Sequence, residues 1–221
     1  MNHYRATSSS IKAVKKLLKV ESEEPPTSVT PPTNMGCEMS TDSQTLSVLR
    51  NRKNRSELYK RPGDREDWRL PLDAWQRFYL QKSWKTVARK SDRAASTVFL
   101  TMLQDNPGLR QKWPRIRALT DEEIPTSPYI KFLGERIFDC LDYIIDNLGD
   151  LDHVISELTK LGRQHADMKV MTPEDVWAIE AAFLAGVQEC LEDRFTTKYE
   201  EIYSRFIVFV IETMVIGFDP H

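Results

Sequence analysis

The sequence lacks the features that mark a disulfide-stabilised, zinc-binding or membrane-spanning protein. Its three cysteines, Cys37, Cys140 and Cys190, are widely spaced and form neither a disulfide framework nor a zinc pattern. No apolar run approaches the roughly 18 residues that cross a bilayer. The N-terminus lacks the apolar core of a signal peptide, and Asn2 stands where N-myristoylation needs glycine. We therefore expect a cytoplasmic protein with no transmembrane segment. The formal net charge is only −2, so we expect no nucleic-acid partner.

Residues 1–65 differ in composition from the rest of the chain. They hold 12 Lys/Arg against 7 Asp/Glu, whereas the remainder holds 19 against 26. The segment 23–33 contains doubled prolines, which lack a backbone donor and fix φ. We therefore predict a disordered extension over residues 1–68 and a single domain over residues 69–221.

Two basic segments of this extension leave alternatives open. In residues 11–20 apolar residues alternate with lysines. This segment either contacts a membrane surface or a partner protein, or is a transient helix in a disordered tail. Residues 50–55 are either a nuclear-import or phosphate-binding patch or a solvated linker. Any contact made through this tail is expected to be weak.

From about residue 71 the sequence predicts consecutive helices, because no segment shows a strand-like period of two flanked by turn signals. The first helix is predicted from Pro71 to Val87, and the second ends at the Asn106–Pro107 break. The inward side chains of the first helix are predicted to be Trp75, Phe78, Trp84 and Val87. Helix N-caps are predicted at Asp92, Ser127, Asp150 and Thr172. The domain is predicted to be all-α.

The segment 151–165 combines a regular apolar stripe with a histidine. The apolar residues at positions 151, 154, 155, 158 and 161 repeat at the spacing of one helix face. His165 lies four residues after Leu161 and seven after Leu158, so it points the same way as these leucines. Neutral imidazole is a good iron ligand. The alternative for His165 is a packed, hydrogen-bonded core histidine.

Four segments resemble those of globins, and they occur in the order of that family. Residues 99–113 contain an Asn-Pro turn, followed six residues after Pro107 by the aromatic Trp113. Three further segments are similar to the distal, penultimate and final helices of neuroglobin-, cytoglobin- and nematode-type globins: residues 133–150, 172–177 and 199–206. The resemblance covers roughly residues 70–217 and implies the globin fold, a three-over-three helical sandwich.

The resemblance also implies a haem b group whose iron is held by His165 on its proximal side. There Leu161, Met171 and Val176 are expected to pack against the porphyrin. The free ring N–H of His165 is expected to meet a backbone carbonyl or a side-chain acceptor near Leu161. Trp113 takes the place of the phenylalanine that stacks on haem in most of the family.

On the distal side the resemblance places Leu133 where most globins carry a histidine and Ile137 directly above the iron. Phe99 falls where many globins carry a tyrosine that donates a hydrogen bond. The histidines of the chain are His3, His153, His165 and His221, and none lies in the distal helix, so this helix cannot supply a second histidine ligand. Arg136 is expected beside a haem propionate, beside a bound ligand or in solvent. Gly134 is expected where the second and distal helices cross closely.

Three functions fit these observations. The first is a haem protein that binds a diatomic gas (oxygen, CO or NO). The second is a redox globin that acts as an NO dioxygenase, nitrite reductase or peroxidase. The third is a haem-free globin-fold interaction module, which the presence of His165 disfavours. Because no distal donor stabilises bound oxygen, a sensor or redox role is favoured over bulk oxygen storage or oxygen transport. Cys140 and Cys190 are expected to be small core residues, and the oligomeric state stays open.

Overall fold

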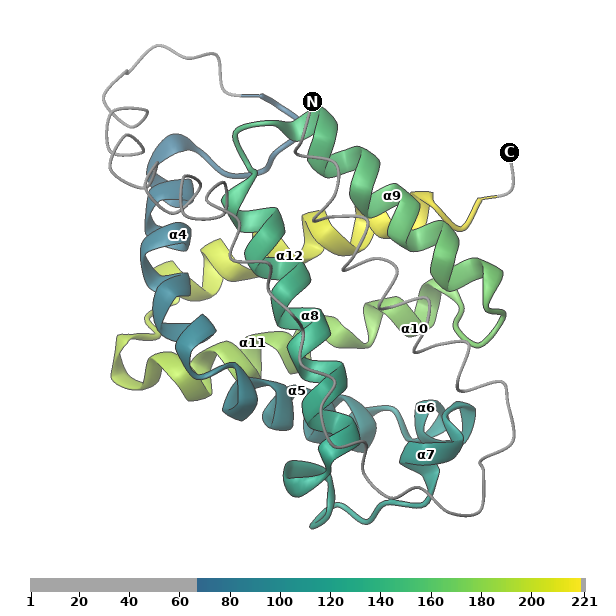
Figure 1. Cartoon of the computed structure of the whole chain (residues 1–221). Helices are drawn as coiled ribbons and strands as arrows, with labels where there is room; N and C mark the ends of the chain where they lie inside the picture. Colours follow the sequence, from purple (N-terminus) through teal and green to yellow (C-terminus); the bar gives the residue numbers. More distant parts are fainter. Residues whose placement is uncertain (1–66, 220–221) are drawn as a thin grey trace, which may run out of the picture. The chain divides into compact units, whose positions relative to one another are not determined.

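The structure is a computed structural model that describes residues 67–219 (Figure 1). Within this range every regular element is a helix and no strand occurs, as the sequence predicts. The elements are α4 (Ala74–Arg89), α5 (Ser91–Asp105), α6 (Pro107–Lys112), α7 (Pro114–Arg117), the 3₁₀ helix η2 (Ile124–Thr126), α8 (Pro128–Asp146), α9 (Leu151–Asp167), α10 (Pro173–Trp177), α11 (Ile179–Leu191), the 3₁₀ helix η3 (Glu192–Arg194) and α12 (Thr197–Ile216). The extension predicted over residues 1–68 lies, except for its last two residues, outside the described part.

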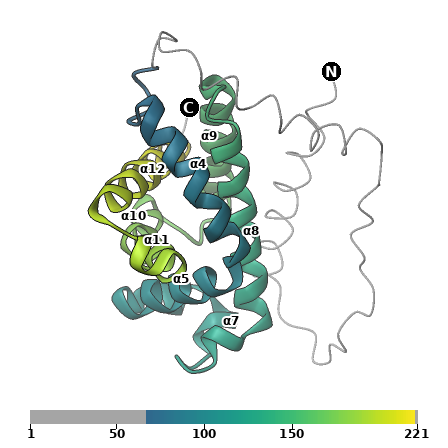
Figure 2. The same ribbon diagram turned by 90° about the vertical axis from the view of Figure 1, so that its left-hand side faces the viewer.

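The long helices form two layers of three. One layer contains α4, α8 and α9, and the other contains α5, α11 and α12 (Figures 1 and 2). The layers meet where α8 packs on α5, α9 packs on α12, and α4 packs on α11 and α12. This is the three-over-three arrangement that the sequence predicts. No helix within residues 67–219 is long and apolar enough to span a bilayer.

Local hydrogen bonds define where several helices begin. The side chains that accept a backbone hydrogen bond at a helix start are Asp73 for α4, Ser127 for α8, Asp150 for α9 and Thr172 for α10. In α4 and α10 the third helical residue also accepts a hydrogen bond from the N-cap N–H, which completes a capping box. The predictions at Ser127, Asp150 and Thr172 are therefore confirmed.

The prediction of Asp92 as an N-cap is wrong. Lys90 alone connects α4 to α5, so α5 already begins at Ser91 and Asp92 lies in its first turn. The N–H of Lys90 donates to the carbonyl of Val87 and its own carbonyl accepts from Ala94, so the link belongs to both helices. In this position the carboxylate of Asp92 stabilises the helix start through the dipole rather than as a cap.

Aromatic side chains join the long helices in the core, both within a layer and between the layers. Tyr203 and Phe183 are fully buried, and the Tyr203 hydroxyl lies 2.9 Å from the Ser83 hydroxyl on α4. Trp84 stacks on Phe138 of α8, with ring centroids 5.8 Å apart and an interplanar angle of 10°. These contacts tie α4 to α8 and α12, the helices that surround it.

The first helix buries only part of the set predicted to face inward. Trp84 and Val87 are buried, but Trp75 is 71% exposed, and the partly buried Phe78 lies on the same outward side, so the inward prediction is wrong for Trp75 and Phe78. Successive helical residues turn by about 100° around the axis. The face that holds Leu80, Trp84 and Val87 therefore directs Trp75 to the opposite side of α4.

Candidate functional site

The candidate site is built around His165, which lies in the last turn of α9. The chain leaves this helix through Met168 and Lys169, and Lys169 has a φ of 55°, in the left-handed region that ends a helix. The helix approaches α12 at Gly162, where a Cβ would collide with the carbonyl of Met214. Close backbone packing on α12 thus holds the helix that carries His165.

One hydrogen bond defines the state of the His165 ring. Nδ1 lies 2.9 Å from the carbonyl oxygen of Leu161, one turn earlier in α9. A carbonyl only accepts, so Nδ1 carries the proton and donates it. In the neutral ring the lone pair then belongs to Nε2, and no residue between 67 and 219 forms a hydrogen bond with that atom. The imidazole is thereby prepared to bind a metal through Nε2.

Burial keeps this ring neutral. It lowers the pKa of His165 below the usual 6.5, and the hydrogen bond to Leu161 opposes the shift only in part. Neutral imidazole is the form that ligates metals. Both the protonation state and the tautomer therefore fit a ligand whose Nε2 faces an electrophile.

The described part of the chain contains no metal site built from protein side chains alone. Within residues 67–219 no three His, Cys, Asp or Glu side chains gather at a place where they could hold a metal ion. A metal held by His165 would need most of its ligands from a cofactor, as iron in a porphyrin has from the ring nitrogens. The donor set therefore fits a haem iron better than a metal ion bound by protein alone.

The other apolar residues predicted for the site come from several elements. They are Phe99 on α5, Trp113 between α6 and α7, Leu133 and Ile137 on α8, Leu161 on α9, Met171 in the turn before α10, and Val176 on α10. Phe99, Trp113 and Val176 are buried. The other four are partly buried. Apolar surroundings with a single polar handle are typical of cofactor sites.

The helices α8 and α9 diverge from the turn at residues 147–150 (Figure 1). They pack on different partners, α8 on α4 and α5 and α9 on α12, rather than closely on each other. Leu133 and Ile137 lie in the first half of α8 and His165 at the end of α9, so both sets are remote from the shared turn. A flat group held between a distal and a proximal helix requires this separation.

The crossing of α5 and α8 depends on Gly134. A Cβ at this position would overlap the Cβ of Ala95, so only glycine permits the helices to approach this closely. The close crossing predicted at Gly134 is present, and Ala95 is the residue opposite. This close crossing sets the distance between Phe99 on α5 and the distal residues on α8.

Arg136 lies along the surface of α8, between two side chains of its own helix. Its Nη2 is 3.0 Å from a carboxylate oxygen of Asp139, and its guanidinium carbon is 5.9 Å from the centroid of the Phe132 ring. Its Nε is buried and has no hydrogen-bond partner in the described part of the chain. In this structure the guanidinium pairs with Asp139 of its own helix, and the role of Arg136 beside a propionate, beside a ligand or in solvent stays a prediction.

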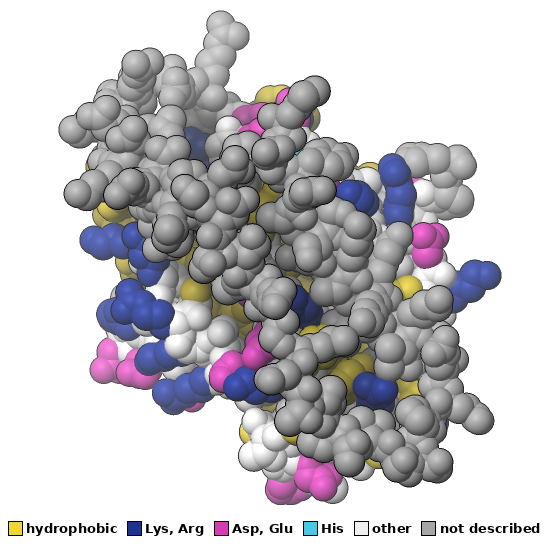
Figure 3. All heavy atoms as spheres, in the orientation of Figure 1, with side chains coloured by type: hydrophobic (Ala, Val, Ile, Leu, Met, Phe, Trp, Pro, Cys, Tyr) yellow, Lys and Arg dark blue, Asp and Glu magenta, His cyan; other side chains and the backbone are white. Residues whose placement is uncertain are grey.

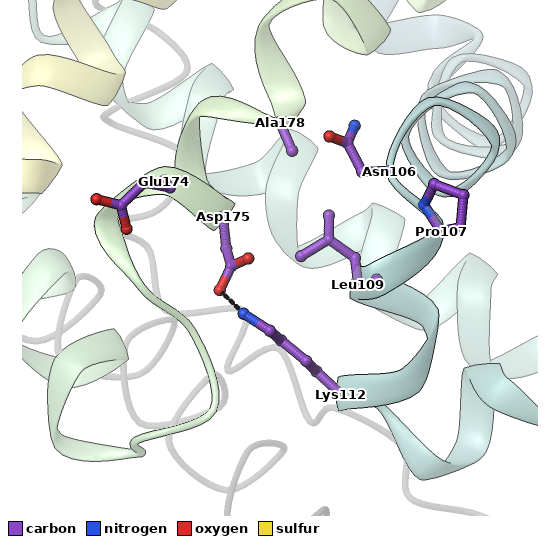
Figure 4. A pocket seen from close by; sticks show the side chains of 8 residues that line it. Asn106, Pro107, Leu109, Lys112, Glu174, Asp175 and Ala178 are labelled. Carbon is purple, nitrogen blue, oxygen red and sulfur yellow. Dashed lines mark hydrogen bonds and ion pairs between the residues drawn. The ribbon is translucent and has the colours of Figure 1, made fainter.

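A hollow of about 330 Å³ between α6 and α10 lies outside the predicted site (Figure 4). Lys112 on α6 forms an ion pair with Asp175 on α10 across it. Partial burial raises the pKa of Asp175, but Lys112 and the hydrogen bonds with Thr172 more than offset this and leave the pKa lowered. The pair fixes α10, and with it Val176, against α6.

The decisive comparison is a family model. The model of the globin family matches residues 96–214, more than half of the 221 residues. The chain belongs to the globin family. The match includes His165 and every other residue predicted for the haem site.

This globin is similar to two fish cytoglobins and to a solved structure. It is 27% identical to cytoglobin-1 of Danio rerio over 88 residues, which are 39% of this chain and 51% of the relative. It is 20% identical to cytoglobin-2 of Oryzias latipes over 148 residues, 66% of this chain and 83% of the relative. The crystal structure of a hexacoordinated heme protein from an anhydrobiotic tardigrade at pH 4 matches with a TM-score of 0.65 and 25% identity, covering 69% of this chain and 99% of that chain. The match with cytoglobin-1 thus spans about half the length of that relative.

Two features of this globin were missed by sequence reasoning. The hydroxyl of Tyr143 on α8 is hydrogen-bonded to Nε2 of His153 on α9, so this histidine is engaged at the α8–α9 turn. Glu157 is buried although it lies outside the apolar stripe of α9, and its Oε2 has no hydrogen-bond partner within residues 67–219. A polar residue next to an apolar stripe gives no signal of burial, because its exposure depends on which helix packs there.

Proposed function

We propose that this globin binds haem b and that Nε2 of His165 is the proximal ligand of its iron. The observation that carries the proposal is the 2.9 Å hydrogen bond from Nδ1 to the Leu161 carbonyl, because it leaves Nε2 as the only lone pair of a neutral ring. Membership of the globin family and the similarity to a heme protein from a tardigrade support it. When bound, haem supplies an iron that takes up oxygen, CO or NO reversibly.

The proximal residues orient the ligand and exclude water. The carbonyl of Leu161 fixes the plane of the imidazole and, by accepting its N–H, makes Nε2 more basic. The side chains of Leu161, Met171 and Val176 offer only apolar surface to a porphyrin. Trp113, buried beside α6, offers an aromatic face for stacking. These four residues would bind the ring through shape and hydrophobic contact rather than through charge.

The distal residues support a sensor or redox role. Leu133, Ile137 and Phe99 can neither ligate iron nor donate a hydrogen bond. His153 is engaged with Tyr143, so it is not available as a second ligand. We therefore propose a five-coordinate ferrous iron, unlike the tardigrade protein described as hexacoordinated. With no donor among these three distal residues, and with Arg136 paired to Asp139 on its own helix, nothing stabilises the charge on a bound ligand, so iron should oxidise quickly in air, which disfavours oxygen storage.

The free thiols of Cys140 and Cys190 fit a reducing compartment, and we propose a cytoplasmic location. Burial raises the pKa of both thiols, that of Cys140 to about 11, so neither is a reactive thiolate at neutral pH. A cysteine is therefore not expected to carry out redox chemistry here. We propose that any NO dioxygenase, nitrite reductase or peroxidase activity belongs to the iron.

The test is reconstitution with hemin. We expect one haem per chain, identified as haem b by its pyridine haemochrome spectrum. His165→Ala should lose most of this binding, whereas the control His153→Ala should keep it, because His153 is committed to Tyr143. Full haem retention with an unchanged Soret band in His165→Ala would refute the assignment. If the wild-type chain binds no haem, a haem-free interaction module becomes the better description.

A further inference from the structure

The outward face of α4 carries a continuous stripe of aromatic and basic side chains. Trp75, Phe78, Lys82, Lys85 and Arg89 follow one another at spacings of three or four residues, so they share one side of the helix. Trp75 is 71% exposed, and the three basic residues are exposed as well. The stripe lies opposite the buried face of α4, and the core does not explain it.

The positive charge of this stripe is not neutralised by the described protein. The helix contains four basic residues and no acidic one. Lys82, Lys85 and Arg89 form no ion pair within residues 67–219, although Lys82 lies 5.8 Å from the centroid of the Phe78 ring. Several other exposed bases of the same range are paired, as in Arg93–Glu189, Lys131–Asp92 and Arg205–Glu201, whereas single bases such as Arg117, Arg163 and Lys169 have no ion pair within residues 67–219. The stripe therefore presents three unpaired positive charges on one helix face, to which an external anionic partner can bind.

Exposed tryptophans lie at the beginning of the stripe. Trp75 meets Phe78 edge-on with ring centroids 6.4 Å apart, and Trp68, in the turn before α4, is 89% exposed. Indole rings combined with lysines and arginines are typical of elements that lie at a bilayer surface. Figure 3 shows Lys and Arg side chains gathered over α4, at the left of the view. A straight helix of 16 residues is about 24 Å long, so its three exposed cations can contact one flat bilayer surface at the same time.

We propose that this α4 face binds the surface of a membrane that contains anionic lipids. The three cations would lie against the lipid headgroups, while Trp75 enters the interface at the start of the helix. The complementarity is that of unpaired positive charge with an anionic plane. The proposal is independent of haem binding, because the α4 face contains none of the residues assigned to the haem site.

The test uses the full chain and two sets of vesicles. We expect it to sediment at low salt with phosphatidylcholine vesicles that contain about one third phosphatidylserine, and not with phosphatidylcholine alone. Raising the salt concentration should release it. The variant K82Q/K85Q/R89Q should lower the partition coefficient on the order of 100-fold, since each of the three cations contributes about fivefold near such a surface. Trp75→Ala should lower it several-fold.

The matched control is R93Q/K131Q/R205Q, which removes the same charge from bases that are already paired with carboxylates. Circular dichroism should show that both triple variants unfold at the temperature of the wild type. The proposal is wrong if the wild-type chain does not bind the anionic vesicles, or if the control variant loses binding as severely. It is also wrong if K12Q/K15Q/K16Q abolishes binding while the α4 variant retains it. Binding to poly-glutamate but not to vesicles would identify an acidic protein partner instead.

Discussion

The crossing of α5 and α8 gives the sharpest prediction about stability, namely that Gly134→Ala destabilises the fold. A Cβ at position 134 would overlap the Cβ of Ala95, so the two helices must separate. Adding a methyl group to a packed core costs about 1–3 kcal/mol. The upper value applies here, since neither Cβ can rotate away. Alanine is better than glycine in a helix by about 1 kcal/mol, so we expect a net loss of about 2 kcal/mol in the free energy of unfolding.

The reciprocal change Ala95→Gly should rescue this variant. Once the Cβ of residue 95 is removed, the nearest atom to the new Cβ at position 134 is the Cα of residue 95, at 3.6 Å, an ordinary van der Waals contact. Ala95→Gly alone should cost about 1 kcal/mol through helix propensity. The double variant again has one glycine and one alanine at the crossing, so its stability should lie within about 1 kcal/mol of the wild type. The expected coupling energy is about 3 kcal/mol, the cost of the clash that the double variant removes.

Urea unfolding of the four proteins measures this cycle. CO rebinding kinetics of the haem-loaded proteins add a functional reading, because the crossing positions Phe99 relative to Leu133 and Ile137. The reasoning fails if Gly134→Ala unfolds at the same urea concentration as the wild type. It also fails if Ala95→Gly worsens Gly134→Ala instead of relieving it, since the clash between the two Cβ atoms would then not be the cause.

Three further predictions concern the proposed site. Because burial lowers the pKa of His165 below 6.5, its contribution to apoprotein stability should be complete above about pH 6.5 and decline as the pH falls toward the folded pKa. Urea unfolding between about pH 8 and about pH 5 should show a smaller decline for His165→Leu, and equal slopes would contradict this. The ferrous wild type should be five-coordinate and high-spin in visible spectra, whereas Leu133→His should become six-coordinate and low-spin or oxidise more slowly in air; a low-spin wild type would overturn this. A chain that starts near residue 67 should fold and bind haem like the full chain, and its failure to fold would show that residues 1–66 are required.

Sequence reasoning succeeds where a side chain and its backbone partner are close neighbours in the chain. The N-caps Ser127, Asp150 and Thr172 are of this kind, because each contact is completed within three residues. The predictions for Asp92 and Trp75 fail for non-local reasons. A one-residue link between α4 and α5 displaces the start of α5 to Ser91, and burial of the opposite face of α4 directs Trp75 outward.

The same distinction applies to the candidate site. The hydrogen bond from His165 to Leu161 is predictable, since both residues lie on one helix a turn apart. Gly134 could be placed at a helix crossing, but Ala95, the residue that it faces, depends on the packing angle of α5 against α8. The Tyr143–His153 hydrogen bond likewise joins two helices whose separation no local pattern determines.

Arg136 shows why the distal side remains adaptable in this fold. Its ion pair with Asp139 is an i,i+3 contact on a partly exposed helix surface, where such pairs are worth only about 0.2–0.5 kcal/mol. Its buried Nε has no hydrogen-bond partner within residues 67–219, and an unsatisfied buried donor costs about 1–3 kcal/mol. A haem propionate or a bound ligand that accepted from this guanidinium would therefore offset more than the loss of Asp139. The ion pair with Asp139 holds Arg136 only weakly, so a rotation toward the haem site costs little, and we expect Arg136 to turn there when a group bound in that site accepts a hydrogen bond from Nε.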